Sequence, residues 1–350
     1  MTTMTTINKA ACFTDIHWGR KNNSERHNQD CLRFVEWFCE NVKADKDIDH
    51  IIFLGDWFEH RAAINSLTLE YAYKGACLIR DLGLPVYFIV GNHDLYYRTT
   101  REIASTNFFE GFGFHLIKDK PVVFEELGPR GALLCPFLFE NEYPSLVQYS
   151  SVPVWFGHFE FKGFVVTGDT KKMDHGPDAK EFDKAKRIFS GHFHKRQTDG
   201  NVTYIGNAFP ADFSDANDFD RGMMVYTYDE DDVKFINWPD CPTYIKTTLS
   251  KIVENPKMLQ NASTVSCTVD MDITYEDSIA LKKQLTEKFD LREIDLKENP
   301  ERQAALEGTE VDDDELDELD TTEEMVIAML SSMDVETIDN QRLIKIYKGL

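Results

Sequence analysis

The stretch Pro85-Val86-Tyr87-Phe88-Ile89-Val90-Gly91-Asn92-His93-Asp94 joins a short apolar run to four small or polar residues. A run this short and this rich in β-branched and aromatic side chains predicts a buried strand. The four residues after it then lie at the carboxyl end of that strand, where open α/β sheets bind their ligands. Taken alone, Asn-His-Asp after a strand is more often a turn than a functional site.

Four other segments repeat this format, in which an apolar run ends in Asp or His, usually beside Gly. They are Phe13-Thr14-Asp15-Ile16-His17, Phe53-Leu54-Gly55-Asp56, Trp155-Phe156-Gly157-His158 and Phe189-Ser190-Gly191-His192-Phe193-His194. Five strand ends that all offer metal-type ligands are hard to explain as unrelated turns. The repetition therefore predicts a metal site at the edge of a sheet.

Strands and helices alternate over the first hundred residues. Ser24 precedes a run with helical spacing, and a second helix is predicted over residues 66–82, ending at Gly83 with Pro85 beyond it. This order is typical of a parallel α/β sheet. From residue 187 to residue 238 strands dominate instead, so we expect two sheets packed face to face and flanked by helices.

The pattern restarts after Cys241 as strand, strand, helix and strand, which predicts a small α/β unit. Residues 306–320 hold nine Asp or Glu, so an extended acidic linker is expected there. An apolar helix follows from Met325, and it either packs on the α/β unit or docks on a partner. The expected domains are residues 1–240, the core that carries the five motifs; 241–298, a small capping unit; 299–320, the linker; and 321–350, a helical tail.

Composition excludes several classes of function. With 61 acidic and 38 basic side chains the formal net charge is -23, which argues against coating nucleic acid or a membrane by global charge. Any polyanionic substrate must be held locally, and the candidate basic clusters, each also readable as ordinary surface charge, are Arg20-Lys21, Arg98 with Arg101, Lys171-Lys172 and Lys195-Arg196. Seven cysteines without a Cys-x-x-Cys motif, and no apolar stretch of membrane-spanning length, predict a cytoplasmic protein.

The ligand types indicate the metal. Asp, His and Asn together suit borderline divalent ions such as manganese, iron or zinc, whereas an all-oxygen shell would suit magnesium or calcium. Two such ions about 3.5 to 4 Å apart share a hydroxide that can attack phosphorus in line. One carboxylate must bridge the ions, and we expect Asp56 because it stands alone on the second strand, between the two ligand clusters.

In this order the five motifs resemble the calcineurin-like metallophosphoesterase superfamily. Within it the chain is similar to SbcD-type DNA double-strand-break repair nucleases, and most similar to the recombination endonuclease subunits of T-even-like bacteriophages. The resemblance covers roughly residues 8–240, including the stretch from Tyr204 to Asp215, and extends to the last third in layout only. It implies an α/β fold: a two-sheet metallophosphoesterase sandwich flanked by helices, a small α/β capping domain and a C-terminal helical tail.

The resemblance also implies a role for each residue. Asp15, His17 and His194 would hold one ion, Asn92, His158 and His192 the other, and Asp56 would bridge them. His93 would face the scissile phosphate and stabilise it or protonate the leaving oxygen, with Asp94 as its orienting partner. Archaeal relatives carry a second functional histidine three residues after the bridging aspartate. Here that position is Glu59 and His60 follows it, so a catalytic role for His60 is an open expectation.

The function that the resemblance implies is a dinuclear-metal-dependent DNA endonuclease and exonuclease, which hydrolyses phosphodiesters with a metal-bridging hydroxide. It would be the catalytic subunit of a nuclease–ATPase complex in DNA recombination, repair and replication. The expected cofactors are two divalent ions, manganese first and magnesium as the alternative. The expected partners are DNA, an SbcC-type coiled-coil ATPase bound through the C-terminal tail, and a second copy in a homodimer.

Two alternatives stay open. The first is a phosphatase or phosphomonoesterase of the same superfamily, but those enzymes resemble Gly-Asp-x-Val-Asp-Arg-Gly and Gly-Asn-His-Glu. This chain has Gly-Asp-Trp-Phe-Glu-His-Arg and Gly-Asn-His-Asp at those places. The second is a non-catalytic scaffold that kept the fold. A scaffold predicts lost ligands, and none of the motifs lacks one.

Overall fold

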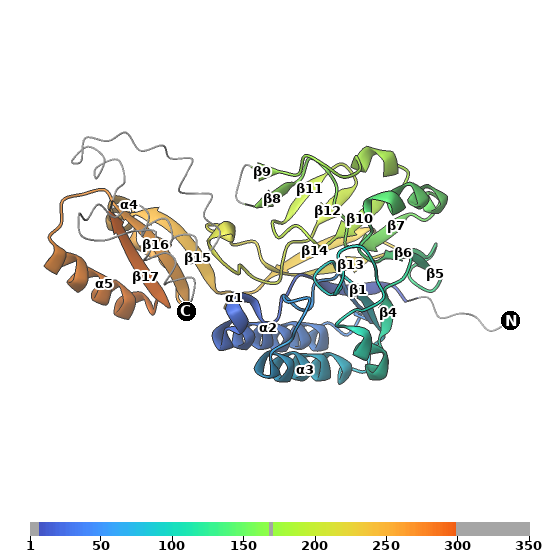
Figure 1. The fold of residues 1–350 in the computed structure, drawn as a ribbon, viewed down its shortest axis with the longest axis horizontal. Helices are drawn as coiled ribbons and strands as arrows, with labels where there is room; N and C mark the ends of the chain where they lie inside the picture. The colour runs from blue at the N-terminus through green and yellow to red at the C-terminus, as the bar shows by residue number, and fades with distance from the viewer. Residues whose placement is uncertain (1–6, 168–170, 299–350) are drawn as a thin grey trace, which may run out of the picture. The chain divides into compact units, whose positions relative to one another are not determined.

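The strands that carry the five motifs divide between two six-stranded sheets (Figure 1). The structure, a computed structural model, describes residues 7–167 and 171–298. Residues up to 267 together with 271–296 belong to one compact unit, and the account below concerns its described part. The predicted linker and tail, residues 299–350, lie outside the described residues.

The first sheet has the order β14-β13-β1-β2-β3-β4. Its strands are β1 (Lys9–Phe13), β2 (His50–Phe53), β3 (Val86–Ile89), β4 (His115–Ile117), β13 (Gly222–Thr227) and β14 (Asp232–Asn237). The run from β1 to β4 is parallel, as the strand-helix-strand order predicts. The hairpin of β13 and β14 adds to β1 in antiparallel fashion, an attachment that the local pattern did not indicate.

The second sheet has the order β11-β12-β10-β7-β6-β5. Its strands are β5 (Val122–Phe124), β6 (Ala132–Cys135), β7 (Val154–Gly157), β10 (Arg187–Ser190), β11 (Gln197–Asp199) and β12 (Val202–Tyr204). The four inner strands are parallel, and the two edge strands are antiparallel. Parallel strands end at the same edge of a sheet, so the segments after β7 and β10 lie next to each other.

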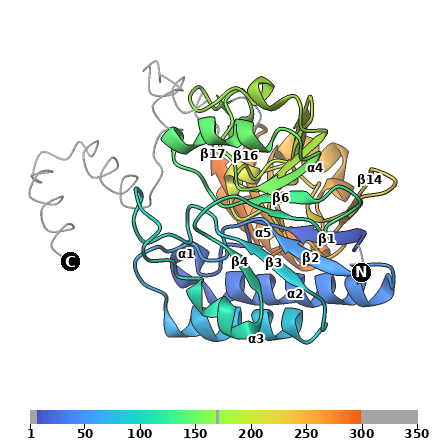
Figure 2. The same ribbon diagram turned by 90° about the vertical axis from the view of Figure 1, so that its right-hand side faces the viewer.

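Two helices, α2 (Glu25–Ala44) and α3 (Ser66–Arg80), cover the outer face of the first sheet (Figure 2). Each begins where a side chain accepts a backbone N–H: Ser24 caps α2, and Asn65 caps α3. The predicted end of the second helix is confirmed by Gly83, whose φ of 71° is left-handed. The short α1 (Arg20–Asn23) precedes α2.

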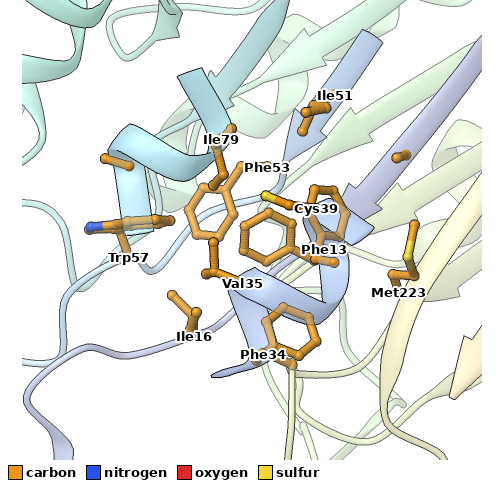
Figure 3. Packing of buried hydrophobic residues seen from close by; sticks show 14 of the residues in the cluster. Phe13, Ile16, Phe34, Val35, Cys39, Ile51, Phe53, Trp57, Ile79 and Met223 are labelled. Atoms are coloured by element: carbon orange, nitrogen blue, oxygen red, sulfur yellow. The ribbon is translucent and has the colours of Figure 1, made fainter. Parts of the chain in front are cut away.

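Apolar side chains fill the spaces on both sides of the first sheet. Phe13 of β1 points at the helices, and its ring lies 4.9 Å from Phe53 and 5.5 Å from Phe34 (Figure 3). Its neighbour Cys12 belongs to the second cluster, with Phe156 and Phe189 of the other sheet. Because both faces of these strands are buried, their sequences are uninterrupted apolar runs. Burial of each Phe side chain stabilises the fold by about 1.5 to 3 kcal/mol.

Beyond residue 241 the predicted small α/β unit is present as a three-stranded sheet of order β15-β16-β17 with two helices. Its elements are β15 (Thr243–Thr248), α4 (Leu249–Glu254), β16 (Ser263–Val269), α5 (Tyr275–Phe289) and β17 (Glu293–Glu298). The remaining elements are β8 (Val165–Thr167), β9 (Lys171–Lys172), and the 3-10 helices η1 (Asn107–Phe112), η2 (Glu140–Tyr149), η3 (Ala179–Phe182), η4 (Phe213–Asp215) and η5 (Pro256–Met258). The domain boundary at residue 240 stays a prediction.

The architecture is thus the expected α/β two-sheet sandwich with helices on its outer side. All seven cysteines are free thiols, and five of them are buried. Within residues 7–167 and 171–298 no helix has the length and apolar character needed to cross a bilayer.

Candidate metal centre

The seven predicted ligands come together at the carboxyl ends of five strands from both sheets. Three of them, Asp15, His17 and His194, form one group whose ligand atoms all lie within 4.8 Å of one another. Asp56, His158 and His192 form a second group by the same measure. Asn92 completes the second group, because its Oδ1 lies 2.9 Å from His158 Nε2 and 3.0 Å from His192 Nδ1.

Asp56 lies between the two groups. Its Oδ2 is 3.7 Å from His17 Nε2 in the first group and 3.4 Å from His158 Nε2 in the second. Its Oδ1 accepts the backbone N–H of His93 at 2.8 Å, which fixes the orientation of the carboxylate. This placement is the one that a bridging ligand requires, and the bridging role itself stays a prediction.

The backbone at the strand ends is held in an uncommon conformation. Asp15 and His17 each have a φ of 50°, Asp56 has 61° and His192 has 87°, all in the left-handed region that non-glycine residues rarely occupy. Each such residue costs on the order of 1 to 3 kcal/mol, and such residues cluster where function requires them. The turns that follow these strands are therefore strained, and they direct the ligand side chains into the site.

Glycines stand beside the ligands because the neighbouring chains approach too closely for a side chain. A Cβ on Gly91 would lie 2.2 Å from Asp56 Oδ1. A Cβ on Gly191 would lie 2.2 Å from Thr14 Oγ1 and 2.8 Å from Asp15 Oδ2. Both distances are impossible without displacement of a ligand or its partner, which accounts for the recurrent Gly in the motifs.

Hydrogen bonds behind the ligands orient the rings. His158 Nδ1 lies 2.7 Å from the Leu54 carbonyl oxygen, so Nδ1–H donates there and Nε2 is the ring nitrogen that faces Asp56. His17 Nδ1 lies 2.9 Å from Glu59 Oε2, within ion-pair distance. A partner of this kind fixes the tautomer of a metal-binding histidine and raises its basicity.

The charges of the site favour a bound cation. Although burial lowers the pKa of His17, bonds to Asp15 and Glu59 raise it to about 10. Burial opposes the proton of His158 as well, yet Asp56 raises the pKa of that ring to about 9. Burial raises the pKa values of Asp15 and Asp56, but the surrounding histidines bring both below the ordinary value. Buried carboxylates thus hold protons on two rings, which are the places that metal ions can take.

The donor set fits two borderline divalent ions. His194 Nε2 and His17 Nε2 face each other at 3.3 Å, a separation that needs a shared proton or a shared cation between the two lone pairs. Burial lowers the pKa of His194 to about 4, with the charge of His17 acting in the same direction, so the proton of the pair belongs to His17, where a metal cation could replace it. Imidazole, carboxylate and amide donors together match manganese, iron or zinc.

The three predicted catalytic residues lie in different surroundings. His93 is half-buried at the edge of the site, with its ring centroid 4.9 Å from that of His17 and its Nδ1 2.8 Å from the Glu59 carbonyl oxygen. Burial lowers the pKa of His93. His60 is exposed, and among the described residues it belongs to none of the potential ligand groups.

Asp94 is fully buried and accepts the backbone N–H groups of Asp56, Trp57, Phe58 and Gly91 at 3.0 to 3.2 Å. Within the described chain its carboxylate makes no bond to the His93 ring, whose Nδ1 partner is the Glu59 carbonyl. Asp94 therefore holds the strand ends that carry Asp56 and Asn92 in place. The contact that orients the His93 ring in this structure is with the Glu59 carbonyl, and the catalytic part expected of Asp94 stays a prediction.

Two further residues belong to the site and were not predicted as functional. Glu59 forms a potential ligand group with His17 and His93, and its position three residues after Asp56 was the available signal. Asp215 lies 3.9 Å from His194 Nδ1 and accepts the backbone N–H of Ala211 at 3.1 Å. The only sequence feature that pointed to Asp215 was the resemblance of Phe213-Ser214-Asp215 to the nuclease family. Asp215 lies too far along the chain from the five motifs for a short residue spacing to connect it to them.

Comparisons with known proteins agree with this geometry. Residues 9–196 match the family model of the calcineurin-like phosphoesterases. A protein described as "Exonuclease subunit 1" from Enterobacteria phage T4 is 31% identical over 186 residues, which are 52% of this chain and 54% of the relative. A "DNA double-strand break repair protein Mre11" from Archaeoglobus fulgidus is 26% identical over 106 residues, 30% of this chain and 23% of the relative.

The chain therefore spans about half the length of the phage relative and less of the archaeal one. Among solved structures, a dimetal phosphatase from Danio rerio has a TM-score of 0.38 and 9% identity, covering 63% of this chain and 93% of its own. A nuclease MPE from Pseudomonas putida has a TM-score of 0.31 and 16% identity, covering 65% and 87%. These two likenesses are too low to carry an argument. The family match over residues 9–196, which contain all seven predicted ligands, shows that the chain belongs to the calcineurin-like phosphoesterase family.

Proposed function

We propose that this protein is a DNA nuclease that uses two divalent metal ions to hydrolyse phosphodiester bonds. The observation that carries the proposal is the complete ligand set, in which Asp56 reaches both groups and His93 stands at the edge. The names of the two curated relatives, an exonuclease subunit and a double-strand break repair protein, favour DNA over other phosphate esters.

The residues of the site would have three kinds of role: holding the metal ions, orienting the ligand rings and fixing the backbone. Asp15, His17 and His194 would hold one ion, and Asn92, His158 and His192 the other, with Asp56 common to both. When bound, the two ions supply Lewis acidity that activates water and neutralises the phosphoryl oxygens. The Leu54 carbonyl keeps the His158 ring in the required tautomer, and the Glu59 carboxylate lies within ion-pair distance of the His17 ring. Asp94 keeps the segments after β2 and β3 at a fixed separation through four backbone N–H groups.

His93 handles the proton of the leaving group in this proposal. Its Nδ1–H donates to the Glu59 carbonyl, so the exchangeable site is Nε2. Burial lowers the pKa of the ring in the free protein. A bound phosphate restores the protonated form, because an opposite charge within a few ångströms raises the pKa of an imidazole. The imidazolium can then stabilise the phosphoryl oxygen or protonate the departing oxygen.

The wider assignments rest on the resemblance of the motifs. We propose manganese as the physiological ion, with magnesium as the alternative, and action in the cytoplasm, that of the host cell if the protein is viral, during DNA recombination, repair and replication. An SbcC-type ATPase would bind the tail at residues 321–350, and the catalytic subunit would form a homodimer. The acidic balance, a net charge of -23, predicts weak DNA binding by the isolated chain.

The test compares substrates at one active site. With manganese, the purified chain is expected to cleave single-stranded and plasmid DNA and to leave p-nitrophenyl phosphate almost untouched. The reverse preference would identify a phosphomonoesterase, and no activity on either substrate would favour a scaffold. Repeating the assay with the ATPase tests the complex, since stimulation of duplex cleavage is expected only with the partner present.

A further inference from the structure

A cleft of about 330 Å³ opens beside the candidate metal centre, next to Asn92 and His93. Aromatic rings and arginines make up much of its lining: Tyr97, Phe137, Phe139, Arg61 and Arg98. None of these five residues is a predicted ligand. A cleft that combines flat rings with cations next to a phosphoesterase centre has the composition of a nucleotide site.

The inner wall of the cleft is fixed to the metal centre. The Phe137 ring lies 6.0 Å from that of His192 and 6.3 Å from that of His158. The Phe139 ring centroid lies 6.0 Å from that of Phe137, and the Arg101 guanidinium lies 4.5 Å from the Phe139 ring centroid. Arg101 also bonds Glu142 and the Phe137 carbonyl. Arg101 is therefore committed to the wall and is not free to bind a phosphate.

The outer wall presents a partly exposed ring, that of Tyr97, which packs edge-on against Tyr96 with a centroid distance of 4.8 Å. Tyr97 is 42% exposed and lies in a loop that two backbone hydrogen bonds close at its base. The N–H of Tyr96 donates to the Ile103 carbonyl at 3.0 Å, and the N–H of Ser105 donates to the Asp94 carbonyl at 2.8 Å. Since Asp94 also anchors the segments that carry Asp56 and Gly91, the loop is tied to the ligand scaffold. An exposed ring on an anchored loop can stack on a flat ligand without first being ordered.

Two arginines at this cleft lack acidic partners. Within residues 7–167 and 171–298 neither Arg61 nor Arg98 forms an ion pair, and the side chain of Arg61 bonds only the Leu95 carbonyl, at 3.4 Å. Both arginines line the same cleft, together with one carboxylate, Glu160. Burial lowers the pKa of Arg61; the charge of Asp56 acts against this and that of Arg98 adds to it. An anion bound at both guanidinium groups would interact favourably with each of them.

We propose that this cleft binds the nucleotide next to the scissile phosphate, with its base unpaired and stacked on Tyr97 and its flanking phosphate held by Arg61 and Arg98. The inference rests on the proposed nuclease function and adds a substrate preference to it. A base inside a duplex already stacks on its neighbours, so only a single strand or a frayed end can use the cleft. A phosphorylated peptide would satisfy the arginines and leave the rings without a stacking partner.

The test measures binding without metal, so that it does not depend on cleavage. Full-length protein in EDTA at low salt is titrated, by fluorescence anisotropy, into a thymidine oligonucleotide of about twelve nucleotides. A second titration uses an abasic oligomer of equal length and charge. Wild type is expected to bind the thymidine oligomer more tightly, by a factor on the order of 5 to 150, the value of one stacked base.

Variants separate stacking from charge. Tyr97→Ala is expected to abolish the preference for the thymidine oligomer, whereas Tyr97→Phe keeps it. Arg98→Ala weakens both oligomers by the same factor and reduces the salt slope by about 0.7, the value for one phosphate contact on a single strand. The matched controls are Tyr73→Ala, a ring 50% exposed on α3, and Arg130→Ala, an exposed arginine in the loop before β6. Both controls should bind like wild type.

Three results would overturn the cleft assignment: equal wild-type affinity for the two oligomers, an unchanged preference in Tyr97→Ala, or a loss of blunt-duplex binding in Tyr97→Ala as large as the loss for single strands. The experiments can contradict the cleft assignment and the nuclease function independently of each other. Base-dependent binding without any DNA cleavage in manganese would contradict the nuclease proposal alone. Cleavage with no base-dependent binding would contradict the cleft assignment alone.

Discussion

Loading the candidate centre with manganese is expected to release protons, and their number follows from the structure. Against the effect of burial, Asp15, Glu59 and Asp56 raise the pKa of His17 to about 10, and Asp56 and Asp15 raise that of His158 to about 9. At about pH 7.5, below both values, each ring holds a proton that a metal ion must displace. Burial lowers the pKa of His194 to about 4, so that ring contributes none. The expected release is at least about two protons per chain.

The pH dependence gives the sign and the size of the effect. Each proton displaced adds about a tenfold change in apparent affinity per pH unit, equal to 1.4 kcal/mol, so two protons give about a hundredfold. Apparent manganese affinity should rise with this slope up to about pH 9, where His158 loses its proton, and should level off above about pH 10, where His17 does.

Isothermal titration in two buffers of different ionisation enthalpy measures the proton number directly. Glu59→Gln removes one carboxylate that raises the pKa of His17, so the variant should release fewer protons at the same pH. Asp174→Asn, at a carboxylate that is 94% exposed, is the matched control and should behave like wild type. A wild-type release near zero at pH 7.5, with metal bound, would refute the claim that buried carboxylates keep these rings protonated.

Three further predictions concern single parts of the molecule. His93→Ala should bind metal normally and lose activity by roughly 10² to 10⁴, the range for a lost general acid; full activity would make the ring structural. Asp94→Ala should lower the free energy of unfolding by about 3 kcal/mol or more, because four backbone N–H groups lose their acceptor; thermal unfolding unchanged from wild type would contradict this. Deleting residues 321–350 should leave metal binding and single-strand cleavage intact and abolish co-purification with the ATPase; co-purification at wild-type yield would decide for a tail that packs on its own domain.

Much of the site was predictable because its ligands follow their strands directly. An Asp or His one to five residues after an apolar run must lie at the carboxyl edge of a parallel sheet, and the printed order of residues shows this. Asp15, His17 and Asp56 after the first sheet's strands, and His158 after β7, could be placed by this rule alone. The left-handed backbone of Asp15, His17 and Asp56 could not, since Asp and His adopt this conformation only in a minority of their positions.

The remaining features depend on contacts between distant segments. Asp94 has the spacing of a catalytic partner for His93, yet its four amide bonds come from the segment after β2 and from Gly91. Glu59 lies beside His17 only because Trp18 and Phe58 form a bridge between their segments. The attachment of β13 to β1 joins residues more than two hundred positions apart. Pairing at this range follows from the packing of whole sheets and leaves no local pattern.

The central claim is that Asp56 serves two ions, and metal counting tests it most directly. After equilibrium dialysis against manganese, elemental analysis of the wild-type chain should give about two ions, and Asp56→Asn should give about one with turnover lower by several orders of magnitude. The control variant Asp174→Asn, which changes an exposed carboxylate, should keep both ions and full activity. An Asp56→Asn chain that still holds two ions would contradict the bridging role and, with it, the account of the metal centre.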